Sequence, residues 1–175
     1  MYNKIEVKDY GGVLTYRQVD DFLKDWAVAV EGTLQVLQAV TDDKLGQSIL
    51  EGHSTLGWLG WHLVETTGYF SHLAGLTVSM IGQDEPVPAT AREIIAAYEK
   101  AAEAVKEEVA KLSDVDLLTE TGIASVATKG ALLRFLIDHQ THHRGQMMVL
   151  LRQAGLPVPP VMGPTKENAL LGSIT

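Results

Sequence analysis

The stretch from Leu132 to Gln153, LLRFLIDHQTHHRGQMMVLLRQ, limits the possible folds more than any other part of the chain. At about 100° per residue, a helix over this stretch places His139 and His143 on one side. That side also carries Leu132, Phe135, Leu136, Gln146, Met147 and Leu150. A buried imidazole is costly unless its ring nitrogens have partners, and one divalent ion satisfies two rings at once. The spacing therefore predicts a core helix that carries part of a metal site.

Three further stretches have helical periodicity, and residues typical of helix starts precede each of them. These starts are Thr15 with Gln18, Ser54 or Thr55, and Thr90 with Glu93, of which the first and last match a capping box. We expect helices over about 15–40, 54–82, 90–112 and 128–154, a longer crossover over 113–128, and an irregular arm over 1–14. No stretch alternates as a strand does. The sequence therefore predicts an all-α fold, a four-helix bundle, with residues 1–175 as a single domain.

The second expected helix is apolar on nearly every side, so we expect it to be the most buried. Its aromatic side chains, expected in the core rather than on a platform for substrate, are Trp58, Trp61 and Tyr69. His62 lies on one of its apolar faces, which points a third imidazole toward the same interior. Helical bundles build metal sites from side chains on facing helices. We therefore predict a metal site formed by His62, His139 and His143.

Three imidazoles from two helices leave further coordination positions of an ion to water or substrate. Imidazole ligands favour zinc or nickel among the divalent ions. Because neutral ligands do not compensate the charge of the ion, it would be a strong Lewis acid that lowers the pKa of bound water to about 7. The plainer alternative is that each histidine is a packing residue with an ordinary hydrogen bond, which would require three separate solutions in one core.

The remaining histidines are weaker candidates for ligands. His142 points about 60° away from His139, so it could replace a ligand or lie behind one, and we predict an outer or exposed position. His53 precedes the second helix, and His72 points about 80° away from His62. We expect both on the surface or in loops.

Side chains near the predicted ligands could orient the imidazole rings. The candidates are Glu65, Asp138 and Gln146, of which the first two are equally compatible with exposure. The metalloprotease motif H-E-x-x-H is absent, because Gln140 occupies the glutamate position. No nucleophile elbow or phosphate-binding loop occurs. The sequence therefore indicates a metal site without assigning a catalytic residue.

Charge and composition exclude several classes of protein. The 14 Lys and Arg residues against 22 Asp and Glu residues give a formal net charge of -8, which argues against nucleic acid as a partner. The start of the chain lacks the layout of a signal peptide, and no uncharged apolar run approaches the ~20 residues of a membrane span. We therefore expect a soluble cytoplasmic protein with no membrane partner. The chain has no cysteine, so thiol chemistry would need sulfur from another molecule.

The block DHQTHHRGQMMVLLRQAGLPVP, the earlier LGWLGWHLVE and the four-helix layout resemble the DinB/YfiT-like superfamily of metal-dependent enzymes. The resemblance covers nearly the whole chain, and its most specific part is H-x-x-x-H-R-G-Q from His139 to Gln146. It implies a bundle with up-down-down-up connection, and it implies that His62, His139 and His143 are the metal ligands. Members of the superfamily include thiol S-transferases that use bacillithiol or mycothiol and a thiol-dependent maleylpyruvate isomerase. A name that refers to DNA damage would describe the regulation of a relative, not DNA binding.

Two classes of function follow from these observations. The first is a metal-dependent enzyme that transfers a low-molecular-weight thiol, such as bacillithiol, mycothiol or glutathione, to an electrophile, with metal-assisted hydrolysis as the nearest rival. Arg144 or Arg152 could hold the carboxylates of such a thiol, unless both face solvent. The second class is a non-catalytic protein that binds a metal or another ligand. The apolar content of this short acidic chain, and the assembly of similar bundles, also predict a homodimer.

Overall fold

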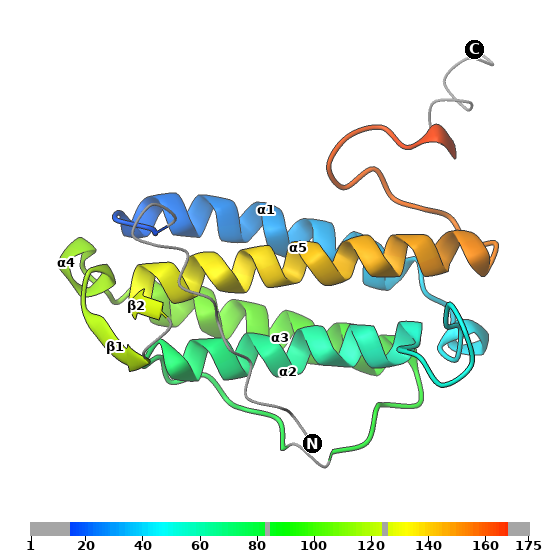
Figure 1. Ribbon diagram of the computed structural model, residues 1–175, viewed down its shortest axis with the longest axis horizontal. Helices are drawn as coiled ribbons and strands as arrows, with labels where there is room; N and C mark the ends of the chain where they lie inside the picture. The colour runs from blue at the N-terminus through cyan, green and yellow to red at the C-terminus, as the bar shows by residue number, and fades with distance from the viewer. Residues whose placement is uncertain (1–14, 83–84, 124–125, 168–175) are drawn as a thin grey trace.

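A computed structural model describes residues 15–82, 85–123 and 126–167 of the chain. Its four long helices are α1 (Val19–Gln38), α2 (Leu56–Leu73), α3 (Ala91–Val109) and α5 (Lys129–Gln153). The short elements are η1 (Asp42–Lys44), α4 (Asp114–Leu117), β1 (Glu120–Ile123) and β2 (Val126–Thr128). The long helices lie side by side, which confirms the predicted all-α four-helix bundle (Figure 1). The arm predicted for residues 1–14 lies outside the described residues.

The directions of the helices give the bundle its up-down-down-up connection. The backbone N–H of Tyr16 donates to the carbonyl of Gly130 at 3.3 Å, so α1 and α5 start at the same end and run parallel. Phe70 near the end of α2 packs against Phe135 near the start of α5, with ring centroids 4.9 Å apart, so these two helices are antiparallel. Helices α2 and α3 run in the same direction (Figure 1). The described parts of the α2–α3 connection therefore run back along the bundle.

Helix α2 ends at Leu73, earlier than predicted. Gly75 follows with φ of 77°, a left-handed conformation that closes helices, and the N–H of Leu76 donates to the carbonyl of Ser71. The chain then packs back on α2, where a Cβ at Gly68 would lie 2.8 Å from the carbonyl oxygen of Ser79. Gly75 therefore ends the helix. The segment that follows packs against the core but is not helical.

The predicted capping box at the start of α1 is wrong. Helix α1 begins at Val19, and Gln18 forms no side-chain cap. The N–H of Val19 instead donates to Asp114 Oδ1 at 2.8 Å, and the Thr15 hydroxyl lies 3.1 Å from that of Thr128. Distant residues therefore replace the local cap. The starts that do follow the prediction are Thr55 for α2 and the Thr90–Glu93 capping box for α3.

The crossover predicted over 113–128 has secondary structure of its own. The short helix α4 opens with a capping box between Ser113 and Asp116. Strands β1 and β2 then form an antiparallel hairpin that leads directly into α5. These strands have four and three residues, which is too short for an alternating pattern to stand out in the sequence. In the described part of the chain, no helix is long and apolar enough to cross a membrane.

Candidate metal centre

The three predicted histidines meet where α2 packs against α5. His62 comes from α2, and His139 and His143 lie one turn apart on α5. Nε2 of His139 is 3.3 Å from Nε2 of His62 and 3.1 Å from Nε2 of His143. One ligand atom from each of the three side chains lies within 4.8 Å of the others. The structure therefore brings together the residues that the sequence singled out from two distant stretches.

The spacing of these nitrogens fits a single divalent ion. Two imidazole nitrogens bound to one zinc ion in tetrahedral geometry, each at about 2.0–2.1 Å, lie roughly 3.3–3.4 Å apart. The two contacts of His139 have nearly this length. A neutral imidazole offers one donor and one acceptor nitrogen, so one Nε2 cannot satisfy two other Nε2 atoms equally well. The three side chains can hold a metal ion.

Burial keeps the three imidazoles neutral. His62 and His143 are buried and His139 is half-buried. Burial, followed by repulsion from the neighbouring histidines, lowers the pKa of His62 to about 4 and that of His139 to about 3. Burial also lowers the pKa of His143, while its hydrogen bond to Gln146 acts in the opposite direction. At neutral pH the lone pairs of these rings are therefore available to a cation.

Two of the three candidates for orienting the rings lie beside them. Nδ1 of His143 donates to Gln146 Oε1 at 2.8 Å, and Nδ1 of His62 lies 3.7 Å from Glu65 Oε2. Both contacts engage the ring nitrogen opposite Nε2, as in metal sites whose ligand rings are fixed from behind. Asp138 does not act in this way, because it forms a bidentate ion pair with Arg134.

The other histidines lie outside the cluster. His142 is exposed, and Gln146 Nε2 donates to its Nε2 at 3.2 Å. His142 therefore lies behind His143, through the glutamine that both share. His53 and His72 are exposed, as predicted.

Aromatic rings cover the histidines, and one of them departs from the prediction. The indole of Trp58 stacks on His62 with centroids 4.7 Å apart and an angle of 11° between the planes. Trp58 is nevertheless 38% exposed and Tyr69 is 39% exposed, so the core position predicted for both is wrong, whereas Trp61 is buried. The side of α2 that carries these two residues borders solvent. Trp58 thus covers one face of a predicted ligand while its own outer surface remains accessible.

Gln140 lies at the centre of the bundle, and its role was missed in the sequence. Its Oε1 accepts from the hydroxyls of Tyr98 on α3 and Thr33 on α1, at 3.2 and 3.4 Å. Its Nε2 donates to Thr67 Oγ1 and to the carbonyl of Leu63 on α2, at 3.0 and 3.2 Å. One side chain therefore connects α5 to the three other long helices, and it does so next to His139.

Arg144 is only 4% exposed, so it cannot hold the carboxylates of a thiol as predicted. Its Nη1 donates to the carbonyl of Ala29 at 2.5 Å and to Thr33 Oγ1 at 3.3 Å. Its Nη2 donates to Thr141 Oγ1 at 2.9 Å. Arg152 is exposed and forms an ion pair with Glu167 at 2.7 Å. The first arginine fastens α5 to α1, and the second is engaged at the surface.

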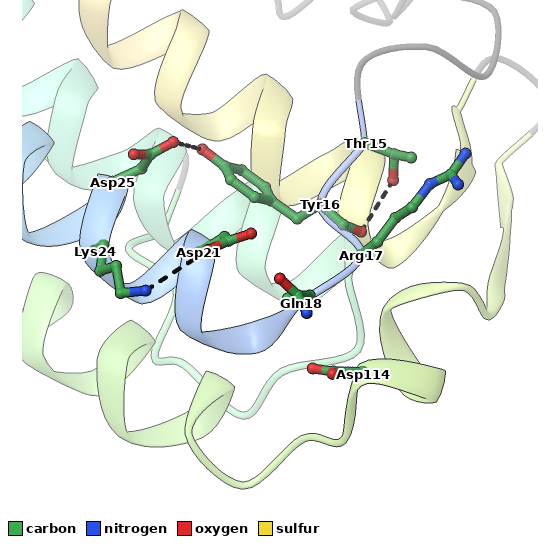
Figure 2. A pocket seen from close by; sticks show the side chains of 8 residues that line it. All are labelled: Thr15, Tyr16, Arg17, Gln18, Asp21, Lys24, Asp25 and Asp114. Atoms are coloured by element: carbon green, nitrogen blue, oxygen red, sulfur yellow. Dashed lines mark hydrogen bonds and ion pairs between the residues drawn. The ribbon is translucent and has the colours of Figure 1, made fainter.

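A separate hollow at the start of α1 contains none of the histidines (Figure 2). Its polar groups are largely paired with one another or with the backbone. Tyr16 donates to Asp25 Oδ2 at 2.7 Å, and burial, followed by this contact, raises the pKa of the tyrosine. Lys24 lies 3.7 Å from Asp21. We assign no chemistry to this hollow.

Comparison with known proteins gives the family. A sequence model of the DinB family matches residues 7–170. The chain belongs to the DinB family. It is 39% identical over 155 residues to the uncharacterized protein YrdA of Bacillus subtilis (strain 168). The matched region covers 87% of this chain and 93% of YrdA. Family membership and the three-histidine cluster together fit a metal-binding protein.

Solved structures of DinB-like proteins share the fold. One from Bacillus cereus ATCC 10987 is 38% identical, with a TM-score of 0.78 over 82% of this chain and 97% of that chain. Another, YjoA from Bacillus subtilis, is 17% identical, with a TM-score of 0.67 over 82% of this chain and 99% of that chain. The DinB-family bundle is therefore retained when most side chains have changed.

Proposed function

We propose that this DinB-family protein is a divalent-metal-dependent enzyme that transfers a low-molecular-weight thiol to an electrophile. The observation that carries the proposal is the convergence of three neutral imidazoles between α2 and α5, where Nε2 of His139 lies 3.1 Å from that of His143 and 3.3 Å from that of His62. His62, His139 and His143 are the proposed ligands, each through Nε2. Zinc and nickel suit this donor set. When bound, such an ion stabilises the thiolate form of a thiol, which is the form that attacks electrophiles.

The side chains of the protein contribute neutrality and orientation. Burial keeps the ligand rings uncharged at neutral pH, because it lowers the pKa of His62 and His139. Gln146 holds Nδ1 of His143, and this contact directs Nε2 toward the other two rings. Trp58 stacks on His62 and shields one face of that ring from water. These contacts support a site that is organised before a metal or a substrate binds.

The sulfur must come from a cosubstrate, because the chain has no cysteine. Bacillithiol, mycothiol and glutathione are the candidate thiols, in keeping with the thiol S-transferases that the sequence resembles. In the proposed reaction the thiol gives its proton to solvent, a sulfur–carbon bond forms, and the leaving group of the electrophile departs with the electrons of its bond to carbon. Metal-assisted hydrolysis and non-catalytic binding are the competing outcomes of the test.

The proposal is tested with 1-chloro-2,4-dinitrobenzene and each of the three thiols in turn. We expect metal-loaded protein to form the thiol conjugate with release of chloride, and the His143→Ala variant to fall to the rate of the uncatalysed reaction. His72→Ala, which changes an exposed histidine of α2, is the matched control and should retain the wild-type rate. Equal rates for wild type and His143→Ala with every thiol would overturn the transferase proposal.

We also propose that the protein forms a homodimer. The apolar side chains of Leu23, Val30 and Leu34 are only partly buried, and they line a hollow between α1 and α3. Apolar surface of this kind supports association of two copies. Light scattering at micromolar concentration should give about twice the mass of the chain, and the mass of a monomer would contradict the proposal.

A further inference from the structure

A small hollow of about 270 Å³ lies between the loop that precedes α2 and the second half of α5. Gln146 is a wall of this hollow and also holds Nδ1 of His143 at 2.8 Å. Leu59, on its other wall, lies one helical turn before His62. The lining of the hollow therefore includes, on each of the two helices that build the candidate metal centre, a residue next to a proposed ligand.

The walls of the hollow are mostly apolar. Its apolar side chains are Ile49, Leu59, Val149 and Leu150. Its polar side chains are His53, Ser54 and Gln146. Leu59 and Leu150 are buried, whereas Ile49 is 56% exposed and Val149 is 47% exposed. Apolar side chains that the fold leaves in water around a concave surface indicate a place for a ligand.

The charge of the surroundings restricts which ligand can bind. Among the residues that the structure describes, those that line the hollow include no Asp, Glu, Lys or Arg. Arg144, the buried cation of the same helix, is committed to Ala29 and Thr33 on another side of α5. A neutral group that is mostly apolar, with one or two atoms able to form hydrogen bonds, is the complementary ligand.

We propose that this hollow binds the carbon body of the electrophile, which is a small, uncharged and largely apolar molecule. This inference rests on the proposed thiol transfer, and it names the class of the second substrate. The volume lies just below the roughly 300–1,000 Å³ of pockets that enclose drug-sized ligands, so it admits a single ring or a short branched chain. Ser54 supplies a polar contact, and the reacting carbon lies toward Leu59 and Gln146, the lining residues next to the proposed ligands.

Direct binding of an unreactive probe tests the inference without relying on turnover. The probe is 1,3-dinitrobenzene, and 3,5-dinitrobenzoate is its charged counterpart. Calorimetric titration of the protein as purified should show that the neutral probe binds at least tenfold more tightly than the benzoate. Similar affinities for the two probes would overturn the assignment of a neutral ligand.

A substitution at the rim locates the binding site. Val149→Phe should fill the hollow and weaken binding of 1,3-dinitrobenzene at least tenfold, with unchanged metal content. Val28→Phe makes the same change at an exposed position of α1 and should bind the probe as the wild type does. Equal affinity of Val149→Phe and wild type would overturn the inference. If the probe binds in a way that depends on Val149 but no conjugate forms, the transferase proposal alone is overturned. If conjugate forms at the same rate in Val149→Phe and wild type, this inference alone is overturned.

Discussion

Helix α5 carries two polar pairs with the same spacing and opposite surroundings. His139 and His143 face α2, and Nε2 of His139 lies close to the Nε2 atoms of His143 and His62. Gln140 and Arg144, each one residue further along, bond to hydroxyls and carbonyls of the other helices. The protein itself completes the hydrogen bonds of the second pair. The two histidines instead converge on a point where one cation can contact both rings. Polar side chains whose hydrogen bonds the protein completes form a structural network, whereas side chains that converge on a shared point can bind a ligand.

The largest expected effect is loss of metal binding when a histidine of the first pair is removed. His139→Ala should lower metal affinity at least about 1,000-fold, because two ligands from different helices hold an ion far less well than three. The free energy of unfolding of the metal-free variant should differ from that of wild type by about 1 kcal/mol, since the contacts of His139 Nε2 are with the other two histidines. Competition with a chromogenic chelator measures the affinity. His142→Ala, at the exposed neighbour, should bind metal with nearly the wild-type affinity, and a large loss there would contradict the assignment of ligands.

Removal of Gln140 should lower stability more than it lowers metal affinity. Gln140→Ala removes four buried hydrogen bonds between α5 and the other three long helices and leaves a cavity, so the free energy of unfolding should fall by about 3 kcal/mol. Urea denaturation of metal-free protein measures this change. Gln153→Ala, at an exposed position near the end of the same helix, should change stability by less than about 0.5 kcal/mol. A Gln140→Ala variant with wild-type stability would break the comparison between the two pairs.

The pH dependence of stability should also distinguish the histidines from Gln140 and Arg144. Burial keeps the pKa of His62 at about 4 and that of His139 at about 3, below the value near 6.5 of the unfolded chain. The unfolded chain therefore takes up protons first as the pH falls, and metal-free protein should lose several kcal/mol of stability between pH 6.5 and pH 4. Urea denaturation across this range measures the loss.

The matched comparison for this pH dependence is His139→Ala against Gln140→Ala. The histidine variant should show a shallower decline than wild type, because one of the depressed groups is gone. The glutamine variant should be less stable at every pH with the wild-type slope, since glutamine does not titrate. Identical slopes for wild type and His139→Ala would show that the imidazoles do not cause the decline.

The smallest effect concerns the contact that holds a ligand from behind. Gln146→Leu removes the acceptor for Nδ1 of His143 and should weaken metal binding about tenfold, as loss of such outer contacts commonly does. The same chelator competition measures it. Gln146→Glu keeps an acceptor at this position and should bind at least as well as wild type. If Gln146→Leu and wild type bind equally, Gln146 does not orient the ring.

The sequence revealed the histidine pair but not the glutamine and arginine pair. Spacing along one helix shows that His139 and His143 share a face, and the second pair has the same spacing. Whether a polar atom finds a partner depends on other helices, and the partners of Gln140 on α1, α2 and α3 lie far away in sequence. For the same reason Arg144 could be assigned to a thiol, although it is buried against Ala29.

The limits of several elements were also fixed by distant contacts. The start of α1 is set by Asp114, 95 residues away, and not by the Thr15–Gln18 pair beside it. Trp58 looked like core because its neighbours in α2 are apolar, yet only the packing of α2 shows that this side borders solvent. Local caps at Thr55 and Thr90 were readable because both partners lie within one turn. Periodicity thus gives the helices, and tertiary contacts decide their ends and their exposed faces.

The most direct test of the central claim is the metal content and coordination of protein purified without added metal. Elemental analysis should find about one divalent ion, zinc or nickel, per chain. X-ray absorption at the metal edge should show three imidazole nitrogens in wild type and fewer in His143→Ala, with no change in His72→Ala. Protein without a stoichiometric ion after loading, or an ion whose imidazole coordination is the same in wild type and His143→Ala, would contradict a centre built from His62, His139 and His143.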